Sequence, residues 1–164
     1  MAKNYILDEG TAARKLQRMA YEILENNVDE PELILAGIRD SGSVIARNIQ
    51  QLLYEISDMK VHIIDISLDK RNPGEITLSV DIDFTDKVIV IVDDVANSGK
   101  TMLYAMKPFL AFQPKKIQTL ALVERTHKKY PVKTDYVGIS LATTLQEHIY
   151  VDVEESVVKG AYMQ

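Results

Sequence analysis

The chain has 164 residues, 46% of them hydrophobic, and a formal net charge of -5, which suits one domain spanning residues 1–164 and argues against a generally cationic nucleic-acid binder. It contains no cysteine, so a disulfide framework and thiolate metal sites are excluded. The N-terminus lacks the apolar core of a signal peptide, and no apolar run approaches the roughly 18 residues that span a membrane. We therefore expect a cytoplasmic protein without membrane contact.

The first predicted elements are a helix, a strand and a second helix. Asp8 is a good N-cap, and apolar residues recur after it at helical spacing up to Leu24. Residues 33–38 are an apolar run of strand length, ended by the polar residues 39–42. A second amphipathic helix is expected over about 43–54. These segments form a strand, a tight loop and a helix.

The rest of the chain continues this alternation of strands and helices. A helix is expected after Thr101 and ends near Pro114. Segment 67–84 is polar and contains proline and glycine, so we expect a mobile loop or a hairpin tip there. Further strands are predicted at 61–66, 76–80, 88–92, 117–123 and 136–139. Because their apolar runs are continuous, they predict an α/β fold with a parallel sheet that is covered on both faces.

The stretch VIVIVDDVANSGKT, residues 88–101, places two carboxylates at the end of an apolar strand. In an open parallel sheet, ligands bind where the carboxyl ends of the strands lead into helices. Gly99 permits a positive φ and a close approach of the ligand to the backbone. The loop offers backbone N–H groups, hydroxyls and a helix N-terminus to a phosphate, through Asn97, Ser98, Gly99, Lys100 and Thr101.

The acidic pair distinguishes this loop from a nucleoside-triphosphate site. Residues 99–101 match the end of the P-loop pattern, but the first glycine of that pattern would have to stand at Asp94. Asp93 and Asp94 suit a ligand that carries ribose hydroxyls, which need acceptors, or Mg²⁺, which needs hard oxygen ligands. A phosphorylated sugar bound with magnesium fits both halves of the motif. The alternative is that the two aspartates only cap a turn after the strand.

These residues carry a resemblance to a known family. Residues 88–101 resemble the phosphoribosyl-pyrophosphate motif of type I phosphoribosyltransferases, with an apolar strand, two acidic residues and a loop closing in Gly-x-Thr. From Tyr5 to about Val151 the chain is similar to the bifunctional pyrimidine operon attenuators with uracil phosphoribosyltransferase activity, through ILDEG, LILAGIRDSGSVIARNIQ and LALVERTHKKYPVKTDYVGI. The resemblance implies a central, mostly parallel sheet with helices on both faces and a small hood.

The resemblance also assigns roles at the phosphoribosyl end of the site. Asp93 and Asp94 would act in catalysis, holding the ribose hydroxyls of 5-phosphoribosyl 1-diphosphate directly or through water on Mg²⁺. Residues 97–101 would hold the 5-phosphate. The attacking group would be a nitrogen of a free nucleobase, and the transition state would have oxocarbenium character, which the two carboxylates favour.

Two further segments would serve the leaving diphosphate. The pyrophosphate loop corresponds to Arg39, Asp40, Ser41 and Gly42. The family branch carries Thr-Arg-Gly at the last three of these positions, so the catalytic positive charge would have to come from Arg39. A flexible loop carrying Lys70 and Arg71 would close over the diphosphate and keep water out.

The base pocket is assigned by family geometry to Val95, Glu124, Arg125 and Leu145. Purine-salvaging relatives carry an aspartate at the position of Asn97 and a lysine at that of Glu124. An amide does not exchange protons in the working pH range, so the resemblance favours uracil as the base.

Two alternatives stay open beside the uracil enzyme: a purine phosphoribosyltransferase, and an RNA-binding attenuator with weak or no transfer activity. RNA would need a basic concave surface, built across a homodimer or a larger homo-oligomer. The family's histidine in the first helix is Tyr21 here. Candidate cations for RNA are Arg14, Lys15, Arg18, Lys128, Lys129 and Lys133.

Overall fold

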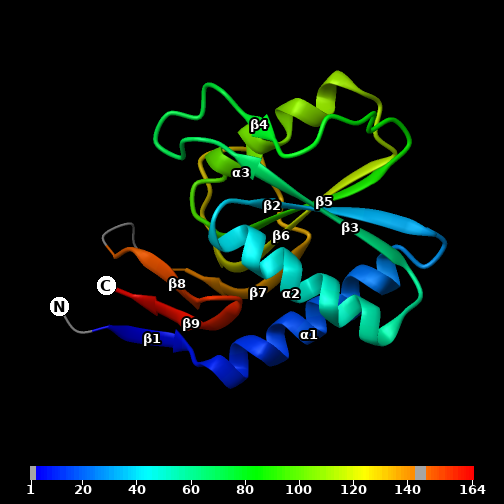
Figure 1. Cartoon of the computed structure of the whole chain (residues 1–164). Coiled ribbons are helices and arrows are strands. Elements are labelled where there is room, and N and C mark those ends of the chain that lie inside the picture. The colour runs from blue at the N-terminus through cyan, green and yellow to red at the C-terminus, as the bar shows by residue number, and fades with distance from the viewer. Residues whose placement is uncertain (1–2, 143–146) are drawn as a thin grey trace.

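The computed structural model describes residues 3–142 and 147–164, which form a six-stranded and a three-stranded sheet (Figure 1). The six-stranded sheet has the order β4-β3-β2-β5-β6-β7, and all neighbours pair in parallel except the β4–β3 edge. Its strands are β2 (Glu32–Ile38), β3 (Lys60–Ser67), β4 (Thr77–Leu78), β5 (Val88–Ala96), β6 (Lys116–Arg125) and β7 (Tyr136–Leu141). The predicted α/β class with a mostly parallel sheet is confirmed.

Helices cover both faces of this sheet. On one face lie α1 (Glu9–Asn26) and α2 (Ser41–Ile56); on the other lie α3 (Lys100–Ala105) and the 3₁₀ helix η1 (Lys107–Ala111). Successive strand residues enter the two cores alternately: Leu35 packs on the α1 and α2 side, and Ile34 on the α3 and η1 side. Because both faces are buried, the strands are apolar at nearly every position.

Several element boundaries differ from the prediction. The Asp8 cap is confirmed, since its Oδ1 accepts a hydrogen bond from the Thr11 N–H at 2.7 Å. However, α2 begins at Ser41, so half of the expected pyrophosphate loop forms the first helical turn. Strand β5 extends to Ala96 and includes both aspartates. The single helix expected up to Pro114 is divided into α3 and η1, because Pro108 has no N–H to continue an α-helix.

The three-stranded sheet is the hood, and its strands were not predicted. It is antiparallel in the order β1-β9-β8, with β1 (Asn4–Leu7), β8 (Ile149–Glu154) and β9 (Val157–Met163). It joins the two ends of the chain over the carboxyl end of the large sheet (Figure 1). Segment 67–84 takes the hairpin alternative, because the two-residue strand β4 pairs antiparallel with the end of β3. None of the helices in the described ranges is both long and apolar enough to cross a membrane.

Candidate active site

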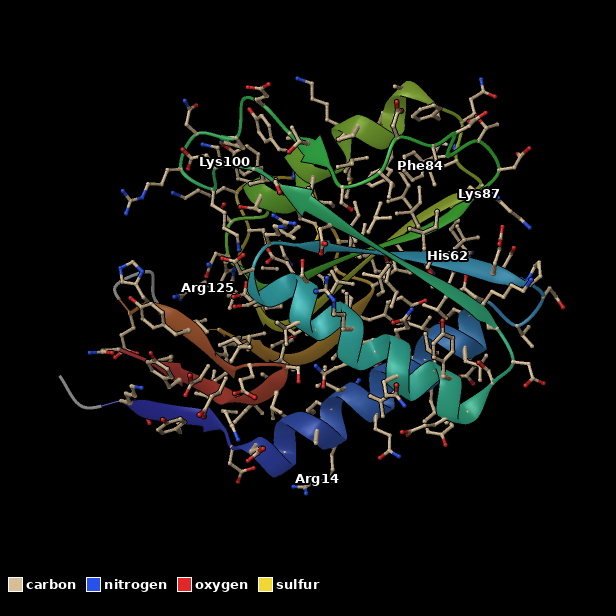
Figure 2. The ribbon with its side chains drawn as sticks, viewed as in Figure 1. Arg14, His62, Phe84, Lys87, Lys100 and Arg125 are labelled. Carbon is tan, nitrogen blue, oxygen red and sulfur yellow. The ribbon has the colours of Figure 1, made fainter. Side chains whose placement is uncertain are left out.

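A cavity of about 320 Å³ lies at the carboxyl end of β5. It brings together the acidic pair, the loop after it, Lys70 from the segment after β3, and Ile149 from the hood. Lys100 and Arg125 lie at this end of the molecule, whereas His62 and Lys87 lie at the opposite end (Figure 2). Its lining residues are Lys70, Asp93, Asp94, Val95, Ala96, Asn97, Ser98, Gly99, Lys100, Thr101, Met102 and Ile149.

The acidic pair belongs to the strand itself and does not cap a turn after it. The Asp93 side chain is 2% exposed and that of Asp94 is 19% exposed. Asp93 Oδ1 accepts the Asp94 N–H at 2.8 Å, and Asp94 Oδ1 accepts the Val95 N–H at 2.7 Å. Burial and then the Asp94 charge raise the pKa of Asp93 to about 8, against the lowering effect of Lys70. A pKa of about 8 leaves Asp93 largely protonated at neutral pH, and a cation beside the pair favours the ionised form of Asp93.

In this structure the Lys70 ammonium supplies that cation. Its Nζ lies 3.1 Å from Asp93 Oδ1 and 3.5 Å from Asp94 Oδ1. Partial burial works to lower the pKa of Lys70, but the two carboxylates outweigh it and raise that pKa. Lys70 was expected above the diphosphate, and it lies instead against the carboxylates. Arg71 is exposed and does not line the cavity.

The donor set of the pair fits a magnesium ion that arrives with a substrate. Mg²⁺ typically keeps several waters and binds one or two carboxylates together with substrate phosphates. The position of Lys70 shows that a cation is accommodated beside both carboxylates at once. Among the described residues, no group of three or more His, Cys, Asp or Glu side chains could hold a metal by itself. Asp93 and Asp94 therefore suit a shared, substrate-borne ion better than a resident one.

The predicted positive φ of Gly99 is confirmed at 87°. A Cβ atom there would lie 3.3 Å from the Tyr130 carbonyl oxygen, so this face of the glycine is closed by the segment after β6. The Ser98 carbonyl accepts the N–H groups of Lys129 and Tyr130, both at 3.0 Å. Ser98 Oγ accepts the Lys100 N–H at 3.2 Å. The loop after β5 is thus supported from behind, and its other side faces the cavity.

The segment expected to receive diphosphate lies between β2 and α2. Gly42 has a packing role here, because a Cβ atom would lie 2.6 Å from the Val92 carbonyl oxygen and 3.2 Å from Asp93 Cα. The first turn of α2, with Ser41 and Gly42, therefore contacts β5 next to the acidic pair. The Arg39 guanidinium turns toward Asp65, with Nη2 3.9 Å from Oδ2. Residues 39–42 do not line the cavity themselves.

The residues expected to contact the base are brought together only in part. Val95 lines the cavity. Arg125 is buried, and it donates from Nε to Asn97 Oδ1 at 2.9 Å and from Nη2 to the Glu147 carbonyl, thereby linking the phosphate loop to the hood. The Glu124 carboxylate is ion-paired with Lys128 and accepts a hydrogen bond from Ser140. The predicted Leu145 lies outside the described residues.

Two contacts at the cavity were not predicted. Ile149 closes it from the hood; its strand has an apolar residue at every second position, Ile149, Val151 and Val153, a period that the prediction missed. The hydrogen bond from Arg125 to Asn97 joins residues 28 positions apart: Arg125 is the last residue of β6, and Asn97 directly follows the neighbouring strand β5. Strand adjacency and the shared carboxyl edge could have suggested it.

Comparison with known proteins agrees with this geometry. The family model for the phosphoribosyl transferase domain matches residues 4–156. The chain is 33% identical over 160 residues to the bifunctional protein PyrR of Streptococcus pneumoniae strain CGSP14, covering 94% of this chain and 92% of the relative.

Solved phosphoribosyltransferases have the same fold. A hypoxanthine-guanine phosphoribosyltransferase from Bacillus anthracis aligns with a TM-score of 0.78 and 20% identity, covering 99% of this chain and 97% of that chain. The hypoxanthine phosphoribosyltransferase of Trypanosoma cruzi aligns with a TM-score of 0.82 and 13% identity, covering 99% and 96%. At these identities the likeness concerns the fold alone. The family match and the PyrR relative go further, and with the acidic pair above a phosphate loop they show that the chain belongs to the type I phosphoribosyltransferases.

Proposed function

We propose that this phosphoribosyltransferase transfers the phosphoribosyl group from 5-phosphoribosyl 1-diphosphate to uracil. The observation that carries the proposal is the cavity in which Asp93 and Asp94 adjoin the loop 97–101, because it offers acceptors for a ribose beside donors for its phosphate. The bifunctional PyrR relatives, matched along 94% of the chain, favour a pyrimidine.

The phosphate loop, the acidic pair and the hood each have a separate role in the transfer. A bond from a base nitrogen to the anomeric carbon forms while the bond from that carbon to the diphosphate oxygen breaks, and the proton of that nitrogen passes to the departing diphosphate or to solvent. The loop 97–101 anchors the 5-phosphate, and the carboxylates of Asp93 and Asp94 hold the ribose hydroxyls and favour the positive charge that develops on the sugar. When bound, magnesium would neutralise charge on the departing diphosphate. The hood, through Ile149, limits the access of water to the sugar.

Asn97 supports the choice of a pyrimidine. A guanidinium is only a donor, so the contact with Arg125 Nε takes the amide oxygen and leaves Nδ2 as a donor at the cavity. An amide in this position cannot exchange a proton with a purine ring. Purine-salvaging relatives carry a lysine at the position of Glu124. Here the Glu124 carboxylate is ion-paired with Lys128 and accepts a hydrogen bond from Ser140, so this side chain cannot donate a hydrogen bond to a purine carbonyl.

The test is a comparison of steady-state rates for uracil, hypoxanthine, guanine and xanthine, each with and without magnesium. We expect uracil to have the highest kcat/KM, and we expect release of diphosphate to require magnesium. The variant Asn97→Asp serves as the matched change, and it should reduce uracil turnover. A purine preferred by about tenfold or more would overturn the base assignment, because that ratio corresponds to about 1.4 kcal/mol of transition-state discrimination.

Neither alternative function is favoured by a specific contact. The hypoxanthine enzymes among the solved structures are too distant in sequence to bear on the base. Three of the candidate RNA-binding cations already have partners: Arg14 donates to Thr11 Oγ1, Arg18 donates to the carbonyls of Val137 and Gly138, and Lys128 pairs with Glu124.

A further inference from the structure

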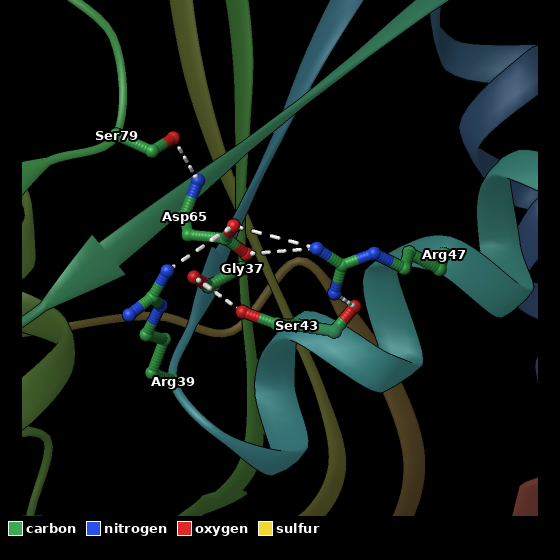
Figure 3. Close-up of polar contacts among 6 residues, drawn as sticks. All are labelled: Gly37, Arg39, Ser43, Arg47, Asp65 and Ser79. Carbon is green, nitrogen blue, oxygen red and sulfur yellow. Dashed lines mark hydrogen bonds and ion pairs between the residues drawn. The ribbon is translucent and has the colours of Figure 1, made fainter. Parts of the chain in front are cut away.

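Asp65, in β3, contacts two arginines outside the cavity (Figure 3). Arg47 Nη2 lies 3.4 Å from both carboxylate oxygens, and Arg39 Nη2 lies 3.9 Å from Oδ2. The Asp65 side chain is 15% exposed, whereas those of Arg39 and Arg47 are 56% and 52% exposed. One sheltered carboxylate therefore holds two guanidinium groups that are open to solvent.

The contacts around Asp65 place this cluster at the segment between β2 and α2. Arg47 lies on α2 and also donates from Nη1 to the Ser43 carbonyl at 3.2 Å. Ser43 Oγ in turn donates to the Gly37 carbonyl in β2 at 3.2 Å. The Asp65 N–H donates to Ser79 Oγ at 2.9 Å, and the Ser79 N–H donates back to the Asp65 carbonyl at 3.0 Å. The segment after β4 thus holds the backbone of Asp65, and the contact between Ser43 and β2 holds the helix that carries Arg47.

The cluster carries a net positive charge. Two guanidinium groups stay ionised at any working pH and share a single carboxylate, so one positive charge is not neutralised within the cluster. Without Asp65 the two like charges would repel each other, and the carboxylate offsets that repulsion. Each guanidinium has five N–H donors in a planar fork, and their exposure leaves donors for an anion with several oxygens.

We propose that Arg47 is a second diphosphate-binding residue and that Asp65 is a positioning residue that holds Arg39 and Arg47 together for that anion. This inference rests on the proposed function. Ser41 and Gly42 carry no charge, so Arg47 would add a second cation to Arg39 beside the segment 39–42. Arg47 lies farther along α2, and its contact with Asp65 holds it beside Arg39.

The competing interpretation is that Arg47 and Asp65 only fasten α2 to β3. The distances of 3.4 Å and 3.9 Å are long for tight hydrogen bonds, and both arginines are about half exposed, so a large contribution to stability is not expected. A fastening role predicts that loss of Arg47 lowers the melting temperature and weakens all ligands alike. A diphosphate role predicts a selective loss.

The experiment is a calorimetric titration with magnesium diphosphate, and in parallel with ribose 5-phosphate, which requires only the acidic pair and the loop 97–101. We compare the wild type with Arg47→Gln, Arg47→Lys and Asp65→Asn, and use Arg14→Gln, an exposed change on α1 far from the site, as the matched control. Arg47→Gln should weaken diphosphate binding by about tenfold or more, the size of a lost charge-assisted contact. Arg47→Lys should restore part of that affinity. Asp65→Asn should weaken diphosphate binding by a smaller factor, and Arg14→Gln should leave it unchanged. The affinity for ribose 5-phosphate should change less than about twofold in every variant.

The outcomes separate this inference from the function on which it rests. A wild-type protein that binds diphosphate, together with an Arg47→Gln variant that binds it equally well, would overturn the role of Arg47 and leave the transfer reaction standing. An equal loss of both ligands with a lowered melting temperature would make the contact a structural fastening and overturn the inference. A folded wild-type protein that binds neither diphosphate nor 5-phosphoribosyl 1-diphosphate would overturn the proposed function itself.

Discussion

The change Lys70→Met tests whether the loop lysine substitutes for a ligand cation at the acidic pair. Lys70 Nζ lies 3.1 Å from a carboxylate that is 2% exposed. Methionine keeps much of the apolar stem and removes the charge. Asp93 and Asp94 then share the cavity without a cation, and the unliganded protein loses the stability that the ion pair contributes, while protonation of Asp93 limits that loss.

The size of that loss follows from the exposure of the two partners. Exposed ion pairs contribute up to about 1 kcal/mol, and removing one partner of a fully buried pair costs about 3–5 kcal/mol. The Lys70 side chain is 45% exposed while Asp93 is buried, so a value between these limits, about 2 kcal/mol, is expected. For a chain of this length that corresponds to a fall in Tm of about 4–8 °C.

The assay is thermal and urea denaturation of the unliganded protein, repeated with saturating 5-phosphoribosyl 1-diphosphate and magnesium. Ligand should reduce the difference in Tm and in unfolding free energy between the variant and the wild type, because Lys70 must leave the carboxylates when the ligand takes its place. The matched control is Lys87→Met, which removes an ion pair to Glu32 at 2.9 Å whose partners are both well exposed. That control should cost clearly less stability than Lys70→Met, with or without ligand, because solvent screens the pair. If Lys70→Met costs no more than Lys87→Met, or if ligand leaves its deficit unchanged, Lys70 is not a substitute cation.

Two further predictions concern the cavity. Asp94→Asn should lower turnover by on the order of tenfold or more while the protein stays folded, because it removes charge at the ligand and no apolar packing; full turnover with unchanged substrate affinity would count against the site. Gly99→Val should abolish binding of 5-phosphoribosyl 1-diphosphate, because a β-branched residue is strained at a φ of 87° and its Cβ would press on the Tyr130 carbonyl, 3.3 Å away. Near wild-type affinity in a calorimetric titration would refute the role of the loop 97–101.

The continuous apolar strands were readable from the sequence because a buried parallel strand leaves few positions for polar residues. The run 88–92 is an example, since it belongs to a strand with a core on each face. The hood strands differ from these, because they are covered only in part. Strand β8 reads IYVDVE and alternates Ile149, Val151 and Val153 with Tyr150, Asp152 and Glu154, a period of two that marks a partly covered strand and that the prediction missed. Its pairing with β9 and the pairing of β9 with β1 are contacts between the two ends of the chain.

The glycines show a second limit of sequence reasoning. A positive φ at Gly99 was foreseeable from a small-residue loop that leads into a helix. The sequence predicted that a ligand would approach the backbone of Gly99 closely. It did not predict that Tyr130, from the segment after β6, would close the other face of this glycine. At Gly42 the requirement comes from the carbonyl of Val92, a residue on another strand. Motif spacing reports which residue type is needed, and the packing partner that needs it comes from the fold.

The pairing of charges is the part that depends most on tertiary structure. Lys70 and Arg71 are adjacent, and the sequence gives both the same expected role over the diphosphate. In the fold, Lys70 enters the cavity and neutralises Asp93, whereas Arg71 stays exposed. Arg47 looked like one more polar residue on an amphipathic helix, yet Asp65 directs it to the side of Arg39. A basic side chain has a long, flexible stem, so its position in the sequence does not determine which carboxylate it reaches; the sheltered acid at the end of the strand does. At this edge of the sheet Asp93 therefore pairs with Lys70, and Asp65 pairs with Arg39 and Arg47.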